Sequence, residues 1–301
     1  MTTAWSRPAP ADDALVRRLE RAALRAVPAE SEWEVRGWLC RWGAGGLVGR
    51  VASAAVSPYA DPADLAPASE VAASYGARGL PPLLRVTPLT PPDLLGEPGL
   101  RETRSPVLVM ARGLEGPHGD GPQRRADGLG ASVAESATVA GSGAADAEPS
   151  GSASQLEGGA AVALSEDVPD AWRAAFLEHH TSAEGPPRLA LAAAAPLPRR
   201  FAVAALDGAV AGLGLGVVAD GTLGVFDVLT VPQRRRRGVA TAVVRALLAW
   251  GRVAGADLAY LQVAAANASA VALYERLGFR RAYAYSYATV SSAASPSPSP
   301  A

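Results

Sequence analysis

The stretch TVPQRRRRGVA at residues 230–240 decides the fold of the second half of this chain. It joins a predicted strand to a long predicted helix, and a short strand, YLQV at 260–263, and the stretch NASAVALYERLGF at 267–279 follow. A strand, a turn rich in Arg and Gly, and a helix start form a site for a phosphorylated ligand, because the backbone N–H groups and the helix dipole face the anion there.

The helix after the arginine run has one apolar face, which follows helical spacing. The residues of this face are Val239, Ala242, Val243, Ala246, Leu247 and Trp250. The face has to pack on the sheet, which fixes the start of the helix beside the end of the predicted strand Leu223–Val231. In the last stretch, Asn267 is a favoured residue for a helix start, and Tyr274 lies seven residues, about two turns, along that helix.

These two stretches, in this order, resemble the acyl-CoA-binding core of the GNAT-superfamily N-acetyltransferases. The family signature Arg/Gln-x-x-Gly-x-Gly/Ala is matched by Arg235, Gly238 and Ala240. The pattern N-x-x-A-x-x-L-Y-x-x-x-G-F is matched by Asn267, Ala270, Leu273, Tyr274, Gly278 and Phe279. The resemblance implies an α/β fold of the α+β type, with a mixed, mostly antiparallel twisted sheet and helices on both faces. It also implies that the protein transfers acetyl from acetyl-CoA to a primary amine by direct attack in a ternary complex, without a metal.

Carried onto this sequence, the resemblance predicts where the cosubstrate acetyl-CoA binds. Its pantetheine arm is expected on the backbone of Val228, Leu229 and Thr230. Its pyrophosphate is expected on the N–H groups of the turn, formed by Arg236, Arg237, Gly238, Val239, Ala240 and Thr241. The small residues allow close approach of the backbone, and the remaining arginines can contact the 3′-phosphate. Asn267 is expected to bond the cofactor arm, to cap its helix, or to do both.

Tyr274 is the predicted proton donor to the departing thiolate, since a phenol can donate to a thiolate of similar basicity. Its alternative role is that of a core residue on an apolar helix face. The general base stays open. Some relatives have a Glu five residues before the Asn, where this chain has Gln262, which cannot act as a base. Asp227 is the nearest acidic candidate, His179 and His180 are alternatives, and a water chain without a dedicated base is equally consistent.

Composition excludes several other classes of protein. The net charge of −1 gives no support for general nucleic-acid or membrane-surface binding. Cys40 is the single cysteine, so there is no intramolecular disulfide and no Cys-based metal site. Met1 to Pro28 has no apolar segment typical of a signal peptide, and no uncharged apolar run reaches the ~18 residues of a membrane helix. A cytoplasmic protein is therefore expected.

We predict two structured parts. Residues 1–112 form an N-terminal α/β lobe, 113–160 a disordered linker rich in Gly, Ala, Ser and Pro, 161–290 the acetyltransferase domain, and 291–301 a disordered tail. Three helices are predicted in these parts. The first begins at Asp12 or Asp13 and ends before Pro28, and the other two span Ala68–Arg78 and Pro169–His180. The predicted strands span Trp33–Trp42, Leu47–Val56, Leu83–Val86, Pro106–Ala111, Phe201–Leu206 and Ala209–Val218. Asp207-Gly208 is a strong hairpin signal.

The first lobe repeats one feature of the second. Tyr75 to Leu80 resembles Tyr274 to Phe279, a helix with Tyr near its end and Gly just past it, which suggests a degenerate acetyltransferase-like half. The same pattern is common at any helix C-terminus. This lobe, the Pro169–His180 helix and the strand with Tyr283, Tyr285 and Tyr287 are expected to shape the acceptor pocket, although the tyrosines also fit one face of an ordinary strand.

The acceptor can be a small molecule, a protein N-terminus or a lysine, because acceptor specificity depends on loops outside the signature. Two other classes of function remain open. One is a non-catalytic acyl-CoA-binding sensor or partner-binding module, which the loss of acid at Gln262 favours and the presence of Tyr274 disfavours. The other is a nucleic-acid-associated protein that uses Arg234 to Arg237, which would show a steep salt dependence of binding.

Overall fold

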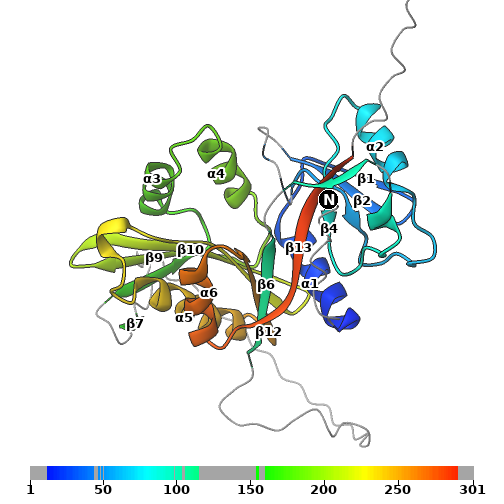
Figure 1. Ribbon diagram of the computed structural model, residues 1–301. Helices are drawn as coiled ribbons and strands as arrows, with labels where there is room; N and C mark the ends of the chain where they lie inside the picture. The colour runs from blue at the N-terminus through cyan, green and yellow to red at the C-terminus, as the bar shows by residue number, and fades with distance from the viewer. Residues whose placement is uncertain are drawn as a thin grey trace, which may run out of the picture.

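The computed structural model describes residues 12–43, 47, 49, 51–97, 99–103, 106–114, 154–155 and 160–290 (Figure 1). The helices are α1 (Asp13–Ala26), α2 (Ala68–Gly76), α3 (Asp170–His179), α4 (Gly185–Ala193), α5 (Val239–Val253) and α6 (Ala268–Arg276), with short 3-10 turns η2 (Leu94–Gly96) and η3 (Pro232–Arg234). The strands of the first half are β1 (Ser31–Val35), β2 (Trp38–Trp42), β3 (Ala55–Val56), β4 (Leu84–Val86), β5 (Leu100–Glu102) and β6 (Val107–Gly113). Those of the second half are β7 (Ser154–Gln155), β8 (Ala161–Ser165), β9 (Arg199–Leu206), β10 (Ala209–Ala219), β11 (Thr222–Thr230), β12 (Leu258–Ala264) and β13 (Arg280–Val290).

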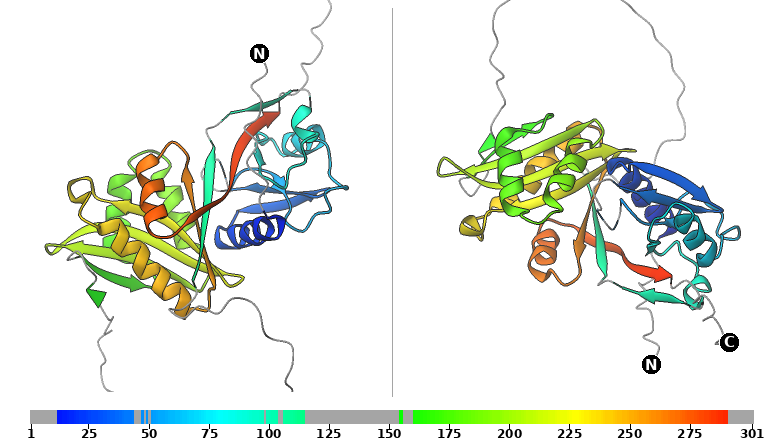
Figure 2. Two further views of the ribbon diagram at one scale, coloured as in Figure 1. Left: turned by 60° about the horizontal axis from the view of Figure 1, so that its bottom comes forward. Right: turned by 90° about the horizontal axis from the view of Figure 1, so that it is seen from above.

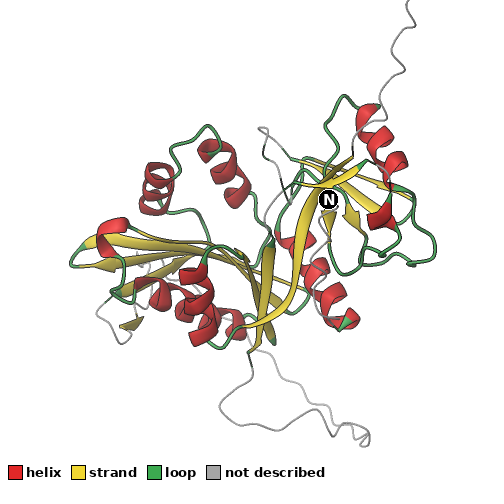
Figure 3. Cartoon of the chain, viewed as in Figure 1, coloured by secondary structure: helices red, strands yellow, loops and turns green. Residues whose placement is uncertain are grey.

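One long sheet dominates the molecule (Figure 3). Its strand order is β4-β13-β6-β12-β11-β10-β9-β8-β7, and β5 pairs with β13 beside this path. Among its described ladders only β11 with β12 is parallel, and the others are antiparallel. A smaller sheet has the order β1-β2-β3. The predicted class, a mixed and mostly antiparallel sheet with helices on both faces, is confirmed.

The helices of the second half cover opposite faces of the long sheet (Figures 1 and 2). Apolar residues of α5 and α6, such as Val243 and Leu277, pack with sheet residues such as Leu261 in one core. On the other face, Trp172 and Phe176 of α3 pack with residues of α4, β9 and β10. Among the described residues, no helix combines the length and the apolar character needed to cross a membrane.

Strands from the first half of the chain complete the sheet of the second half. β6 lies between β12 and β13 and pairs with both, from Gly113 opposite Leu258 to Val107 opposite Ala264 and Tyr285. β4 pairs with the far edge of β13. A boundary at residue 112 therefore falls inside β6 and cuts through the ladder, and the division into two lobes stays a prediction. Most of the predicted linker and the whole tail lie outside the described residues, although β7 falls within the linker range and pairs with β8.

A buried ion pair attaches α1 to the long sheet. Glu20 of α1 and Arg85 of β4 are both almost fully buried and form a salt bridge. The hydroxyl of Tyr283 in β13 donates to Glu20 Oε1 at 2.6 Å. Removing one partner would leave a buried charge without compensation, which is far more costly than losing a surface pair. These contacts therefore hold α1 against strands β4 and β13 of the long sheet.

Two strand predictions for the first half were wrong in extent. Residues 33–42 form two strands, because Arg36 and Gly37 both have positive φ and reverse the chain between β1 and β2. In the range 47–56, the described residues form a strand only at Ala55–Val56, besides isolated bridges at Gly49–Ala52 and Ala54–Leu84. Helices α1, α2 and α3 and the Asp207-Gly208 hairpin are confirmed.

Tyr75, which suggested an echo of Tyr274, has a structural role. It is fully buried, its hydroxyl donates to the carbonyl of Arg41 at 3.0 Å, and it accepts from the N–H of Arg41 at 3.1 Å. Its ring also contacts Trp33, with 4.8 Å between centroids. Tyr75 thus joins α2 to the small sheet, and its hydroxyl both donates and accepts a hydrogen bond within the fold.

Glycines on one face of β10 set the position of α5. A Cβ added to Gly212 would lie 2.5 Å from Val239 Cγ1, and one added to Gly214 would lie 2.6 Å from Val243 Cγ1. Side chains do not tolerate such distances, so the helix packs on the sheet only because these positions carry no side chain. The close packing holds the start of α5 beside the end of β11.

We predict that Gly214→Ala lowers the free energy of unfolding by about 1–3 kcal/mol, the usual cost of overpacking a tight core. Denaturant unfolding measures the change. Gly113→Ala is the matched control in a strand, since nothing lies within 4 Å of a Cβ at that position. Equal stability of the two variants would show that α5 can move away from the sheet without cost.

Candidate functional site

The candidate site lies where the neighbouring strands β11 and β12 separate. β11 and β12 pair from Thr222–Leu258 to Val225–Leu261, and the pairing ends there although β11 continues to Thr230. On its other edge, β11 carries a β-bulge: three residue steps from Phe226 to Leu229 face two steps of β10. Bulges bend a strand and disrupt the ladder, so the second half of β11 diverges from β12. Its backbone groups on that side face a groove instead of a strand.

The groove has a volume of about 850 Å³ and lies between the end of β11, the start of α5 and helix α6. It brings together all of the predicted site residues except Arg237. The lining residues are His180, Asp227, Val228, Leu229, Thr230, Arg235, Arg236, Gly238, Val239, Ala240, Thr241, Asn267, Ser269, Ala270, Leu273, Tyr274 and Arg276. Asp227 and Tyr274, which are 47 positions apart in the sequence, therefore line the same groove.

The start of α5 presents free backbone donors to this groove. Its N-cap, Gly238, has φ +77° and provides no side-chain cap, and Arg236 also has positive φ. The first intrahelical bond to the cap runs from the N–H of Ala242 to the carbonyl of Gly238. Within the described part of the chain, the N–H groups of the three preceding residues, Val239, Ala240 and Thr241, have no backbone or side-chain partner. Such donors at the positive end of a helix dipole favour an anion.

The four consecutive arginines divide into two pairs. Arg234 and Arg237 both bind Asp207 Oδ2 in the β9–β10 hairpin, at 2.7 and 3.0 Å. Arg235 and Arg236 line the groove. The hydrogen bond and charge of Arg237, with those of Arg234, lower the pKa of Asp207. The side chain of Arg237 thus holds the turn from outside the groove, and the predicted contact of its backbone N–H with the pyrophosphate stays a prediction.

Asn267 caps α6 and still has a donor for a ligand. Its Oδ1 accepts from the N–H of Ala270 at 3.2 Å and from the hydroxyl of Ser269 at 3.1 Å. The side-chain oxygen is therefore occupied by the cap, whereas the amide nitrogen carries two further donors. Since Asn267 lines the groove, the cap orients its amide group at the wall of the site. The two roles considered for Asn267 are compatible.

Tyr274 lies at the base of the groove between core and ligand space. Its side chain is 8% exposed, and its ring contacts Phe279 edge-on, with 6.0 Å between centroids. Burial raises the pKa of the Tyr274 hydroxyl. At neutral pH the group is consequently a protonated donor. The core packing considered for Tyr274 is confirmed, and the residue also lines the groove, so its role as proton donor stays a prediction that the position allows.

Two proton acceptors reach the groove. Asp227 is at the bulge with φ +48°, and His180 follows the last residue of α3. His180 Nδ1 lies 2.9 Å from the carbonyl of Phe176. A carbonyl only accepts, so Nδ1 carries the proton in the neutral ring and Nε2 keeps a lone pair. His179 forms a similar contact with the carbonyl of Ala175 and does not line the groove.

Gln262 and Cys40 lie elsewhere. Gln262 Oε1 accepts from the hydroxyl of Tyr285 at 2.8 Å, and its Nε2 is buried without a hydrogen-bond partner in the described structure. Cys40 is fully buried in the core around α1 and α2, and burial raises the pKa of its thiol to about 11. The thiol is therefore neutral at physiological pH, which is unsuitable for a nucleophile.

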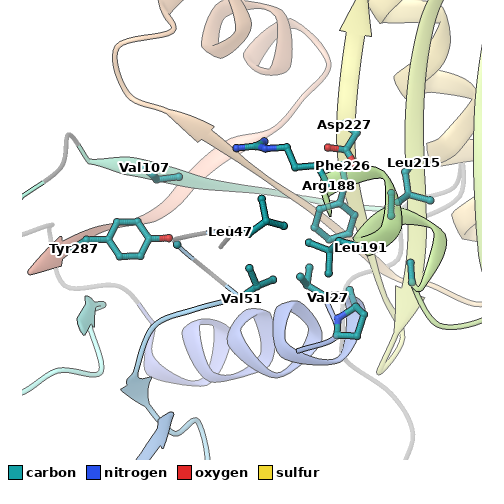
Figure 4. Close-up of a pocket in the computed structure, with 15 residues that line it drawn as sticks. Val27, Leu47, Val51, Val107, Arg188, Leu191, Leu215, Phe226, Asp227 and Tyr287 are labelled. Atoms are coloured by element: carbon teal, nitrogen blue, oxygen red, sulfur yellow. The ribbon is translucent and has the colours of Figure 1, made fainter. Parts of the chain in front are cut away.

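A second cavity, of about 300 Å³, meets Asp227 from the other side of β11. Its walls include residues from α1, the segment after β2, α4, β6 and β13, and Figure 4 shows their side chains around the space. Helix α4 was not predicted, although Pro186 and Pro187 in its first turn are a start signal. Residues of α4 line this cavity, and Tyr287 is the tyrosine of β13 that lines it, whereas His180, at the end of the predicted Pro169–His180 helix, lines the groove. The predicted contribution of that helix to an acceptor pocket stays a prediction.

We expect Asp207→Asn to loosen the arginine turn without breaking the hairpin, because Asn also tolerates positive φ. The lowered pKa of Asp207 means that its stabilising contribution is full above the unfolded pKa and is lost as the pH falls through the folded pKa. Unfolding of wild type and variant at several pH values measures this. Their difference should be largest near neutral pH, shrink in acid and shrink with added salt. A difference independent of pH contradicts the assigned ion pairs.

Comparison with protein families supports the geometry. Residues 164–279 match the family described as "Acetyltransferase (GNAT) family". Residues 13–129 match the family described as "Probable histone acetyltransferase Rv0428c C-terminal". The chain thus contains two acetyltransferase-related regions, which fits a two-lobed arrangement of the superfamily.

Individual proteins are similar to this chain in sequence or in fold. YobR of Bacillus subtilis (strain 168), named an uncharacterized N-acetyltransferase, is 37% identical over 67 residues, which span 22% of this chain and 27% of YobR. A GCN5-related N-acetyltransferase from Kribbella flavida superposes with a TM-score of 0.58, 14% identity and coverage of 94% of this chain and 97% of its own. A putative GNAT acetyltransferase from Novosphingobium aromaticivorans DSM 12444 has a TM-score of 0.50, 21% identity and coverage of 91% and 99%. At these identities the structural likeness shows the fold alone.

Proposed function

Because the chain belongs to the GNAT superfamily of acetyltransferases, we propose that it transfers the acetyl group of acetyl-CoA to a primary amine by direct attack in a ternary complex. The observation that carries the proposal is the groove at the uncapped start of α5, which combines free backbone donors, Arg235 and Arg236, and Tyr274. An amine and a cosubstrate can meet there without a covalent acyl-enzyme, since Cys40 is remote and neutral.

The residues of the groove fit an acyl-CoA. The first-turn N–H groups of α5 would hold the pyrophosphate, and Gly238 keeps the backbone accessible because nothing lies within 4 Å of a Cβ at that position. Arg235, Arg236 and Arg276 supply charge for the phosphates. The unpaired side of β11, from Val228 to Thr230, offers amide and carbonyl groups to the amide-containing pantetheine arm.

Each chemical task has a residue at the groove. Bound acetyl-CoA supplies a thioester whose C–S bond breaks while the amine forms a C–N bond. The Tyr274 hydroxyl, which is protonated at neutral pH, donates its proton to the leaving sulfur. A backbone N–H of the unpaired β11 segment provides the donor for the charge that develops on the acyl oxygen. The amine loses one proton, which Asp227 Oδ or His180 Nε2 accepts, directly or through water.

A purely binding function is the alternative that the same groove allows. A sensor needs the phosphate-binding turn but has no use for a proton donor at the thioester end. Tyr274 in the groove wall, with an uncommitted hydroxyl among the described contacts, favours catalysis. Thiol release in the presence of amines separates the two functions, because a sensor binds acetyl-CoA without turnover.

We predict that Gly238→Val abolishes acetyl-CoA binding in calorimetric titration, because a branched residue is strained at φ +77° and intrudes on the phosphate site. Adenosine diphosphate serves as a second ligand that tests the phosphate site alone. Gly255→Val is the matched control at the other end of α5: it has φ +87° and also no neighbour within 4 Å. Loss of affinity in both variants, or in neither, contradicts the assignment of the phosphate turn.

Tyr274→Phe should reduce kcat by about 100-fold or more, the usual contribution of a positioned general acid, and leave the affinity for acetyl-CoA nearly unchanged. The variant keeps the ring in the core and removes only the hydroxyl. Steady-state thiol release and calorimetry measure the two quantities. Tyr59→Phe, at a tyrosine that is 66% exposed, is the control. A parallel fall in affinity and turnover would assign Tyr274 to binding or packing instead of proton transfer.

A further inference from the structure

We infer that the 300 Å³ cavity on the other side of β11 is the acceptor site, and that it selects a small monoamine with an apolar body over polyamines and over protein amines. The inference rests on the proposed acetyl transfer and adds the class of acceptor to it. It depends on where the cavity lies, on what lines it and on the charges at its wall.

The cavity and the groove meet at one residue. Asp227 lines both, whereas its neighbours divide: Phe226 faces the cavity and Val228 faces the groove. The bulge and the positive φ of Asp227 therefore make it the shared wall of the two spaces. An amine seated in the cavity would reach the groove at Asp227, the residue that the two spaces share.

The cavity suits an apolar body of small size. Figure 4 shows Leu47, Val51, Leu191 and Phe226 around the space, and the aliphatic Val27 at the end of α1 completes this side. A volume of about 300 Å³ is at the lower end of the range for small-molecule pockets. A polypeptide would need hydrogen-bond partners for its backbone around the attacking amine. Among the described residues that line the cavity, those with polar side chains are Arg188, Asp227 and Tyr287, and the other side chains are aliphatic or aromatic.

The charges at the wall favour a single ammonium group. Arg188 and Asp227 contribute one charge of each sign. Arg188 also pairs with Glu184 at 3.1 Å, which is not among the lining residues of the cavity. The guanidinium of Arg188 is 47% exposed and already paired with Glu184, so its repulsion of a further cation is weakened by solvent. The main cost of a second ammonium group is the loss of its water against the aliphatic and aromatic walls of the cavity. A neutral or apolar substituent has no such cost.

The walls come from both halves of the chain, which gives the N-terminal region a role in specificity. Val27 and Val51 belong to the first half, and Leu191 and Leu215 to the second. Tyr287 is on the strand that the first half pairs with through β4 and β6. Residues of the first half thus form one wall of the cavity. Through this wall the first half would contribute to the choice of acceptor.

The first test compares acceptors with the full-length protein at saturating acetyl-CoA. We expect kcat/KM for 2-phenylethylamine to exceed that for spermidine and for a lysine-rich histone-tail peptide by about tenfold or more, the scale on which one pocket discriminates substrates. Thiol release and mass spectrometry of the N-acetyl product measure it. A peptide or a polyamine that is acetylated as efficiently as the aryl amine overturns the inference.

The second test changes the cavity without touching the groove. Leu191→Trp fills the space from α4 and should raise KM for 2-phenylethylamine about tenfold, while the affinity for acetyl-CoA stays unchanged. Leu191→Ala enlarges the cavity and should shift the preference toward bulkier aryl amines. Val253→Trp is the control, at a position that is 84% exposed on α5. An unchanged KM in Leu191→Trp, with intact acetyl-CoA binding, overturns the inference.

Direct binding separates this inference from the proposed transfer. Calorimetric titration of 2-phenylethylamine, with and without coenzyme A, reports on the cavity even when no acetyl group moves. Binding by the wild type that is weakened in Leu191→Trp and retained in Val253→Trp supports the acceptor site. Absence of amine binding under both conditions, in a protein that binds acetyl-CoA, overturns it. Failure to bind acetyl-CoA contradicts the proposed function, and the amine titration then still decides whether the cavity is a ligand site.

Discussion

The separation of β11 from β12 after Val225 is the constraint on which the rest of the structure depends. It arises from a bulge in β11, and it converts an interior strand into a strand with one open edge. The edge would be costly if it were buried without partners. The groove on one side and the apolar cavity on the other both border this gap in the sheet.

The gap has the right surroundings because α5 is held close to the sheet. Gly212 and Gly214 allow contact distances that any side chain would prevent, and the helix start is thereby placed beside the end of β11. Asp207 then holds the preceding turn through Arg234 and Arg237. Backbone packing and two ion pairs together aim the free N–H groups of the helix at the groove.

The first half of the chain is part of the same construction. β6 fills the position between β12 and β13, and the Glu20–Arg85 pair attaches α1 to the sheet. The cavity that meets Asp227 is closed by residues such as Val27 and Val51. The pairing of β6 with β12 and β13, and the hydrogen bond from Tyr283 to Glu20, join segments more than a hundred residues apart in the chain. The two halves therefore depend on each other for the completed sheet and for the second cavity.

The sequence by itself determined what is local. The Asp207-Gly208 turn, the Asn267 cap and the apolar face of α5 follow from short-range sterics and hydrogen bonding. The roles expected of the motif residues came from their resemblance to the GNAT signatures. Tertiary structure decided what depends on long-range pairing. Strand order placed β6 between β12 and β13, and ion pairing separated Arg234 and Arg237 from the arginines of the groove. Packing of α4 and the first half created the second cavity, since residue spacing carries no information on which distant surfaces will meet.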